Sequence, residues 1–553
     1  MFIAILLCFN SAVHASELHD AIRAGDHERV RALIEAGADL SEIDTNGEDP
    51  LATAMWHDNA RAAAMLLDAG ANFVPSRHGE VLPLLLFIKR SDLTLQYLQQ
   101  HRGSLQYGVA QRALLFGASK GALEVVQELV VHQDIHDLDD ENVHHALAFA
   151  AGDNQVAPAK WLLEHGAEPL HVVARQTAME RAAEEGARDV IELFIAHGVD
   201  PHGLTESGKC YVEVALASVV NKIWIGRLAV LTRNAPPAEA AKWVREQMKP
   251  RLDVARFLLN QPGDPGLSLE HKNRALHRAA RTGAIDVMQM LINQGAEPAY
   301  VDDSGRTLIH HAMWANDLSA IQFVESLGFT VLRPADKNGI TALHCAVRAA
   351  NRDAVLYCLD HGVSIEAALT TDIVFDPKGE DQLTAGSRAL HLAAEQAWPD
   401  IVRLLVEHGA SANAQTDHGE TPLLFASYHR ADQSISLLLD ADADVDLANR
   451  DGLTPLMVYR TPIDPIPDIY RRMALRTQAV NATDGEGRTA LIHMISSGPS
   501  RAIEALLDLG ADPTILPDDG RSLRDRIDRR NRFRPLQLPD AIVNRLLSAE
   551  PSP

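Results

Sequence analysis

Apolar and polar positions along this chain repeat in a unit of about 33 residues. Within a unit, one apolar stretch of helical spacing follows a glycine, and a second stretch with a Leu-Leu pair comes after it. The pattern predicts two short helices per unit, which bury their apolar faces only against neighbouring units. In the C-terminal half the starting glycines, spaced 34, 47, 33, 33 and 35 residues apart, are Gly305, Gly339, Gly386, Gly419, Gly452 and Gly487.

Residues at the ends of each predicted helix fit this reading. Thr421 precedes a first helix, where its hydroxyl can cap free N–H groups, and Pro422 follows in a first turn that tolerates a missing N–H. The pair Ala279-Ala280 allows close helix approach, and Gly409 is placed to end a second helix in a left-handed cap. The units are therefore predicted to form a stack of helix pairs.

Two motifs in these units resemble a known family. Gly339–His344 (GITALH) resembles the G-x-T-P-L-H start of ankyrin repeats, and Leu506–Asp512 (LLDLGAD) resembles their L-L-x-x-G-A-D ending. Weaker copies in the N-terminal half end at Leu33–Asp39 and Leu162–Glu168. The resemblance implies an all-α repeat solenoid of ankyrin helix-turn-helix and β-hairpin repeats, with about fourteen units plus terminal caps.

The regularity of the units suggests five segments. These are a signal peptide (1–15), degenerate N-terminal repeats (16–205), an irregular repeat with a helical insertion (206–274), C-terminal repeats (275–519) with a loop insertion near 366–385, and a C-terminal cap and tail (520–553).

Three breaks in the period interrupt the array. Extra residues separate Cys210 from Leu276, Glu366–Ala385 lengthens one unit, and Arg460–Gln478 replaces a first helix with a proline-containing stretch. Insertions in solenoids often lie on the binding face. Sequence drift without a functional role explains each break equally well.

The first residues resemble an export signal. Phe2–Phe9 (FIAILLCF) is an unbroken apolar run, and Val13 and Ala15 place small residues before a possible cleavage site after Ala15. The basic residues that usually precede such a run are missing, so a first apolar helix of the fold is the alternative. We expect a periplasmic or secreted protein.

Charge narrows the class of partner. The formal net charge is −24, with a pI of about 5.4, so the surface should repel phosphate backbones and anionic membranes. No stretch after the first residues is apolar enough to span a bilayer. We expect a monomer whose partner is a protein with a basic patch, and neither nucleic-acid binding nor membrane insertion after signal cleavage.

No motif for catalysis, a metal or a cofactor is evident. Nucleophile elbows, zinc-protease motifs and phosphate-binding loops are all missing from the sequence. His132 and His136 could share a helix face, but no third metal ligand accompanies them. The resemblance assigns most other histidines to structural roles, and Cys345 and Cys358 are expected to be buried small residues, with pairing left open. We therefore predict no catalytic residues, no metal and no cofactor.

The resemblance also implies where a partner would bind. Ankyrin proteins generally contact partners through hairpin tips and exposed positions of the first helix, which form a concave groove. The matching residues here are Asp303, Ser304, Arg306, Trp314, Lys337, Asn338, Ile340, Arg348, Asp417, His418, Glu420, Tyr428, His429, Arg450, Asp451 and Leu453.

These expectations converge on a non-catalytic scaffold or adaptor. It would bind a protein partner, and one version of this role is an immunity or accessory protein of an exported enzyme. Two alternatives stay open: a secreted effector that binds host-cell proteins, and, more remotely, an enzyme whose site lies in the 212–251 insertion.

Overall fold

The computed structural model describes most of the chain. The described residues are 17–44, 48–57, 59–71, 91, 94–95, 98, 107–131, 140–219, 237–262, 267–315, 317–332, 335–374, 382–459, 468–517, 519–533 and 538–548. The expected signal peptide and the residues His132, His136, Trp224 and Pro377–Gly379 lie outside this set. The chain divides into two compact units, Met1–His271 and Lys272–Pro553.

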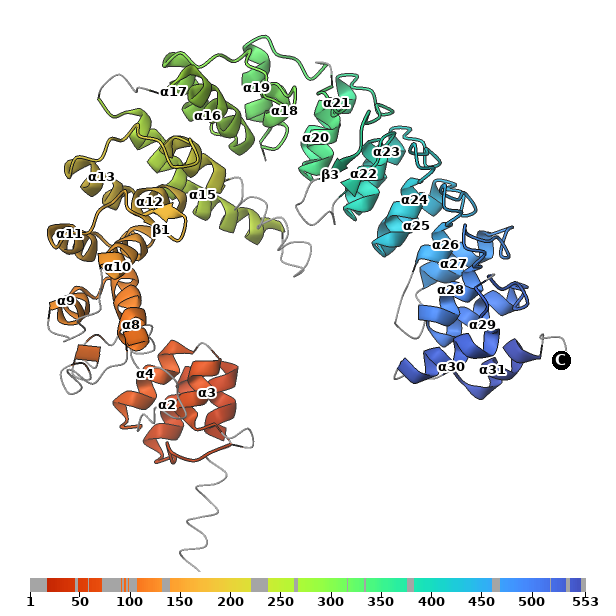
Figure 1. The fold of residues 1–553 in the computed structure, drawn as a ribbon, viewed down its shortest axis with the longest axis horizontal. Coiled ribbons are helices and arrows are strands. Elements are labelled where there is room, and N and C mark those ends of the chain that lie inside the picture. The colour runs from red at the N-terminus through yellow and green to blue at the C-terminus, as the bar shows by residue number, and fades with distance from the viewer. Residues whose placement is uncertain are drawn as a thin grey trace, which may run out of the picture. The chain divides into compact units, whose positions relative to one another are not determined.

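The first unit consists of helix pairs and one small hairpin (Figure 1). Residues 17–24 and 211–219 are also helical. The elements are α2 (His27–Glu35), α3 (Pro50–Trp56), α4 (Ala60–Asp68), α8 (Tyr107–Lys120), α9 (Leu123–Val131), α10 (Asp140–Gly152), α11 (Val156–Glu164), β1 (Val172–Val173), β2 (Gln176–Thr177), α12 (Ala178–Glu185), α13 (Arg188–Ala196) and α15 (Pro237–Leu259).

The second unit begins within α16 and continues the same motif. Its elements are α16 (Leu269–Thr282), α17 (Ile285–Asn293), α18 (Leu308–Ala312), α19 (Leu318–Ser326), α20 (Ala342–Arg348), α21 (Arg352–Asp360), β3 (Ile373–Val374), β4 (Gln382–Leu383), α22 (Ala389–Glu395), α23 (Pro399–Glu407), α24 (Pro422–Tyr428), α25 (Asp432–Asp440), α26 (Pro455–Val458), α27 (Asp468–Arg476), α28 (Ala490–Ser497), α29 (Ser500–Asp508), α30 (Leu523–Phe533) and α31 (Asp540–Leu547).

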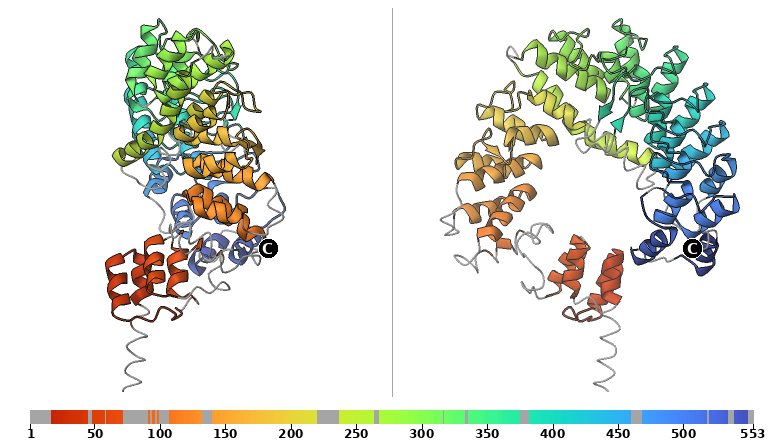
Figure 2. Two further views of the ribbon diagram at one scale, coloured as in Figure 1. Left: turned by 90° about the vertical axis from the view of Figure 1, so that its left-hand side faces the viewer. Right: turned by 45° about the vertical axis from the view of Figure 1, so that its right-hand side comes forward.

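Helices pack on their sequence partners and on equivalent helices of the next pair. First helices meet first helices, as in α20, α22 and α24, and second helices meet second helices, as in α21, α23 and α25. Figure 2 shows these pairs from two further directions. The core is a row of small and branched side chains, among them Ala393 and Ala394, both fully buried. The all-α repeat solenoid is thereby confirmed, whereas the number of units stays a prediction.

Capping follows the sequence signals. The Thr421 hydroxyl accepts the Leu424 N–H at 3.1 Å, and Pro422 lies in the first turn of α24. Gly295, Gly409 and Gly510 have φ angles of 92°, 88° and 88°, the left-handed conformation predicted for residues that end the second helices.

The irregular segments differ from one another. In 206–274, α15 extends over 23 residues with Pro250 inside it, and it packs on α12 and α13. The insertion near 366–385 contains the antiparallel strands β3 and β4. In 460–478 the prolines predicted the loss of a first helix, and Asp468–Arg476 forms α27, which packs on α25 and α29 in the second-helix position. The shortened element is α26, with four residues.

The C-terminal cap contains a buried arginine. Arg530 in α30 is only 5% exposed, and its Nη1 donates to the carbonyls of Met494 and Ile495 at 2.9 and 3.0 Å. Arg530 therefore supplies donors to carbonyls near the end of α28, which have no hydrogen-bond partner within the helix. Among the described residues, no helix combines the length and apolarity needed to cross a bilayer.

Candidate partner-binding surface

The turn before each first helix is shaped by one polar side chain. Asp302 Oδ1 accepts the Arg306 N–H at 2.9 Å, and Asp336 Oδ1 accepts the Ile340 N–H at 2.9 Å. Asn449 Oδ1 likewise accepts the Leu453 N–H at 2.9 Å. Short Asp and Asn side chains favour such turns because they can replace a backbone acceptor. Each tip therefore has a defined conformation.

Adjacent tips are joined by backbone hydrogen bonds. The Lys337 N–H donates to the Ser304 carbonyl at 3.0 Å, and the Asp417 N–H donates to the Ala385 carbonyl at 2.8 Å. At the next junction, the Arg450 N–H donates to the His418 backbone carbonyl at 2.8 Å. These bonds fix the spacing of the side chains that the tips display, so a partner would meet a preorganised surface.

The structure places the sixteen predicted partner-binding residues at three levels of exposure. One is buried, Ile340, at 5% exposure. The half-buried ones are Ser304, Arg306, Trp314, Asn338, Arg348, His418, Glu420 and Leu453. The exposed ones are Asp303, Lys337, Asp417, Tyr428, His429, Arg450 and Asp451.

Several of these residues also connect neighbouring repeats. Lys337 Nζ donates to the Asp303 carbonyl at 2.8 Å, and Glu420 Oε2 accepts the Thr384 hydroxyl at 2.8 Å. The exposure expected for Ile340 is wrong, because its side chain packs inward at the base of the turn. The sequence pattern could not distinguish tip residues that contact the next tip from tip residues that face solvent, because both kinds occupy equivalent positions in the repeat.

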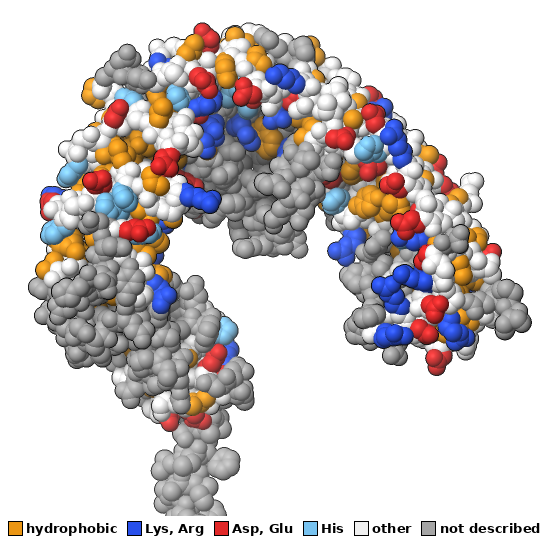
Figure 3. All heavy atoms as spheres, in the orientation of Figure 1, with side chains coloured by type: hydrophobic (Ala, Val, Ile, Leu, Met, Phe, Trp, Pro, Cys, Tyr) orange, Lys and Arg blue, Asp and Glu red, His pale blue; other side chains and the backbone are white. Residues whose placement is uncertain are grey.

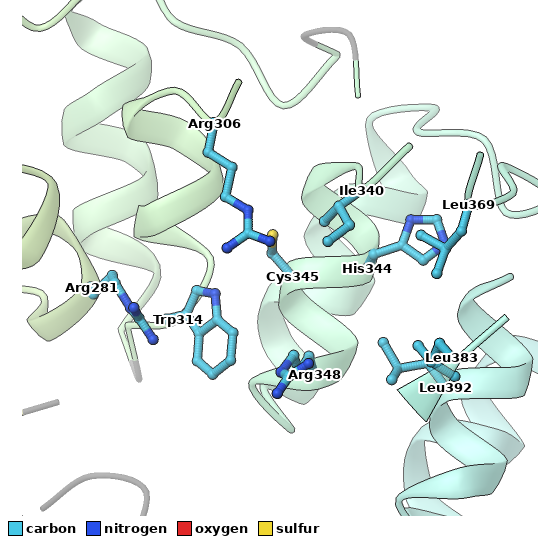
Figure 4. Close-up of a pocket in the computed structure, with 10 residues that line it drawn as sticks. All are labelled: Arg281, Arg306, Trp314, Ile340, His344, Cys345, Arg348, Leu369, Leu383 and Leu392. Carbon is cyan, nitrogen blue, oxygen red and sulfur yellow. The ribbon is translucent and has the colours of Figure 1, made fainter. Parts of the chain in front are cut away.

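A pocket of about 160 Å³ opens beside the first helices of four successive repeats. One side holds Arg281, Arg306, Trp314 and Arg348, and the other side is apolar (Figure 4). Figure 3 shows Lys and Arg side chains gathered over α16 and α18. The apolar side also includes Ile340, Leu369, Leu383 and Leu392, and His344 and Cys345 complete the lining.

Family comparisons match this architecture over more than half of the chain. Models of ankyrin repeats match residues 18–67, 114–203, 276–325, 338–367 and 368–449. The chain belongs to the ankyrin-repeat family. The resemblance noted from the motifs is therefore confirmed, and it extends into the degenerate N-terminal repeats.

The relatives of this ankyrin-repeat chain are diverse. The chain is 32% identical over 204 residues to the B-cell lymphoma 3 protein homolog of Mus musculus, a match that covers 36% of this chain and 42% of the relative. It is 28% identical over 191 residues to the ankyrin repeat protein YahD of Escherichia coli (strain K12), covering 32% of this chain and 94% of YahD.

A third relative carries an enzyme's name. The E3 ubiquitin-protein ligase KEG of Arabidopsis thaliana is 22% identical over 355 residues, which is 58% of this chain but 20% of KEG. The chain spans less than half of the matched B-cell lymphoma 3 proteins and a fifth of KEG. Ankyrin-repeat relatives are mostly interaction proteins, and this is the class of function that the family carries.

The ankyrin motif histidines are buried hydrogen-bonding residues. His391 is 0% exposed; its Nε2 lies 3.0 Å from the Ala414 carbonyl and 3.2 Å from the Glu420 carbonyl, and its Nδ1 accepts the Arg388 N–H at 3.1 Å. Burial lowers the pKa of His391 to about 4, although the two carbonyls act in the opposite direction. The ring is therefore neutral at pH 7 and ties one repeat to the next.

Within the described part of the chain, two clusters have donor atoms close enough to hold a metal ion: His144, Glu168 and His171, and His277, Asp302 and His311. In the second cluster, His311 Nε2 lies 3.0 Å from Asp302 Oδ2, and burial lowers the pKa of His311 to about 3. Asp302 thus shapes its turn with one carboxylate oxygen and faces His311 with the other.

Cys345 and Cys358 are buried and free, as the reading of two small core residues predicts. Burial raises the pKa of Cys345 to about 11, so its thiol stays protonated at neutral pH. The Cys358 thiol lies 3.6 Å from Met313 Sδ.

Proposed function

We propose that this ankyrin-repeat chain is a non-catalytic adaptor, exported to the periplasm, that captures one or a few proteins. Ankyrin-repeat proteins are generally scaffolds for protein–protein interaction. The observation that supports this role most directly is the series of linked hairpin tips in the second unit. It presents Asp303, Asp417, Arg450 and Asp451 to solvent at a spacing fixed by backbone hydrogen bonds.

The charge of the chain favours a basic partner. A net charge of −24 steers cationic surfaces toward the protein over a distance of about 10 Å at 0.1 M salt. Export would place the chain beside other exported proteins. An immunity or accessory protein of a basic exported enzyme satisfies both conditions.

Capture from periplasmic extract tests this function. The full-length chain should retain one or a few basic proteins, and retention should weaken as the salt concentration rises. The double replacement Tyr428→Ala/Arg450→Ala removes two exposed groups and should reduce retention at least ten-fold. The control Arg403→Ala/Glu407→Ala removes two exposed residues of the second helix α23 and should leave it unchanged. Recovery of no protein, or of acidic proteins alone, would refute the proposal.

Fractionation tests the location separately. We expect the chain in the periplasm, with a mature N-terminus at Ser16 that intact-mass measurement can detect. Accumulation in the culture medium would instead favour an effector that acts in another cell. A cytoplasmic chain that retains Met1–Ala15 would contradict export.

A further inference from the structure

An unusual concentration of positive charge lies inside this acidic chain. Arg281 at the end of α16, Arg306 before α18, and Arg348 at the end of α20 line the same pocket, which we call the arginine pocket. Arg306 Nε pairs with Asp336 at 3.0 Å, so at least this cation has a carboxylate partner. A cluster of like charges at the edge of a core is costly unless anions balance it.

Arg281 is the least compensated of the three. Its Nε is buried and has no hydrogen-bond acceptor among the described residues, and none of their carboxylates forms an ion pair with it. Burial, together with repulsion by Arg306, Arg278 and Arg348, lowers the pKa of Arg281 to about 10. A guanidinium that has lost water without gaining an acceptor is ready to receive an anion.

Trp314 orients the cations. The Arg281 guanidinium carbon lies 4.6 Å from the centre of the Trp314 ring, and that of Arg348 lies 6.0 Å from it. Figure 4 shows these two arginines on opposite sides of the indole, with Arg306 above it. Stacking on the ring limits the motion of the side chains and holds their N–H groups toward the pocket.

The opposite wall is apolar. Leu369, Leu383 and Leu392 are 4%, 1% and 2% exposed, and they come from the inserted hairpin region and α22. Drug-sized ligands and cofactors use pockets of about 300–1,000 Å³. A pocket of about 160 Å³ instead suits a single carboxylate with one small apolar group beside it.

We propose that the arginine pocket binds a carboxylate of the protein partner, with an apolar side chain next to that carboxylate against the leucine wall. The carboxylate would belong either to the partner's C-terminus or to an Asp or Glu side chain. This inference rests on the proposed adaptor function and adds a specific contact to it: the acidic surface attracts a basic partner, and the pocket selects one acidic group on that partner.

Small probes test the pocket without the partner. N-acetyl-leucine has a terminal carboxylate beside an apolar side chain, and N-acetyl-leucinamide has the same shape without the charge. N-acetyl-glutamic acid α-amide carries only a side-chain carboxylate. Binding to the full-length chain is followed by tryptophan fluorescence at constant ionic strength, and the Trp314→Phe variant isolates the signal of Trp314 from the other five tryptophans.

We expect at least one of the two acids to bind with a dissociation constant on the order of 1 mM, at least ten-fold tighter than the amide. The tighter acid identifies the source of the carboxylate. Arg281→Gln should weaken binding at least ten-fold, and Arg348→Gln provides the same test should Arg281→Gln not fold. The control Arg352→Gln removes an equal charge at an exposed position of α21, outside the pocket lining, and should change binding less than two-fold.

Three results would overturn the pocket assignment. These are equal binding of acid and amide, unchanged binding by Arg281→Gln or Arg348→Gln, and sulfate binding as tight as that of either acid. If the probes fail while periplasmic capture succeeds, the pocket assignment alone is wrong. If the probes bind while capture fails, the adaptor function is wrong.

Discussion

At the scale of single residues, the motif histidines show how a repeat residue can be structural and still respond to pH. His277, His344 and His391 are 4%, 3% and 0% exposed, and burial lowers the pKa of each to about 4. The resemblance predicted their structural role from the motif. It could not predict the size of the pKa change, which depends on how completely the next repeat covers each ring.

We predict that acid destabilises the second unit. The folded pKa of these histidines lies below the unfolded value of about 6.5, so the folded state binds fewer protons. Their stabilising contribution is complete above about pH 6.5 and is lost as the pH falls toward 4. At pH 5 each histidine should cost about 2 kcal/mol. Urea unfolding at pH 7.5, 6 and 5 measures this loss, and a free energy of unfolding that is constant over this range would refute it.

His391 should contribute more to stability than a surface histidine. His391→Ala removes the ring and leaves the Ala414 carbonyl without this donor, while the Glu420 carbonyl keeps the Thr416 N–H at 2.9 Å. The lost packing and hydrogen bond should cost about 2–4 kcal/mol. His418→Ala, at a half-buried tip position, should cost less than about 0.5 kcal/mol. Urea unfolding at pH 7.5 compares the two variants, and equal losses would contradict the role assigned to His391.

At the scale of elements, some glycines only adopt a left-handed backbone conformation, whereas others also allow close contact with a neighbouring repeat. Gly409 ends α23 with φ of 88° and has open space where a Cβ would lie. Gly386 has a similar φ of 82°, but a Cβ there would lie 2.6 Å from Asp417 N and 2.8 Å from Asp417 Oδ1. Both glycines could be placed in the repeat from the sequence. The close approach at Gly386 could not, because it depends on the neighbouring tip.

This difference predicts unequal alanine substitutions. Gly409→Ala should cost about 1–2 kcal/mol from backbone strain alone. Gly386→Ala should cost a further 1–3 kcal/mol or so, because the new methyl group collides with the backbone of the next tip. Urea unfolding measures both free energies of unfolding. A larger loss for Gly409→Ala would show that the tips are not in contact.

The buried cation Arg251 anchors the long helix α15. Arg251 is 3% exposed; its Nε donates to the Glu184 carbonyl at 2.9 Å and the Ser218 hydroxyl at 3.0 Å, and its Nη2 pairs with Glu185 at 2.5 Å. Replacement by alanine leaves these acceptors without their donor. We expect Arg251→Ala to destabilise the first unit by about 3 kcal/mol. Lys249→Ala, at an exposed position of the same helix, should have little effect in the same thermal unfolding experiment.

At the scale of the whole molecule, the period of the sequence predicted the fold because each unit repeats the same local rules. Thr421, Pro422 and Gly409 act as their positions predict. The interruptions were harder to interpret: the prolines within 460–478 predicted the loss of a first helix, but not that a second helix, α27, begins at Asp468. The sequence also did not predict that the residues of the arginine pocket form one pocket, although Arg306, Trp314 and Arg348 were each predicted to bind a partner. Its residues come from four successive repeats and converge only in three dimensions.

The central claim is that a protein partner binds the face formed by hairpin tips and first helices. Site-specific photo-crosslinking in cells tests it most directly, with a photoreactive residue at Tyr428 or Asp451 on this face and at Glu407 on the second helix as the control; all three positions are exposed. The account predicts that positions 428 and 451 yield the same covalent protein adduct and that position 407 does not. An adduct formed equally well from position 407, or no adduct from 428 and 451, would contradict it.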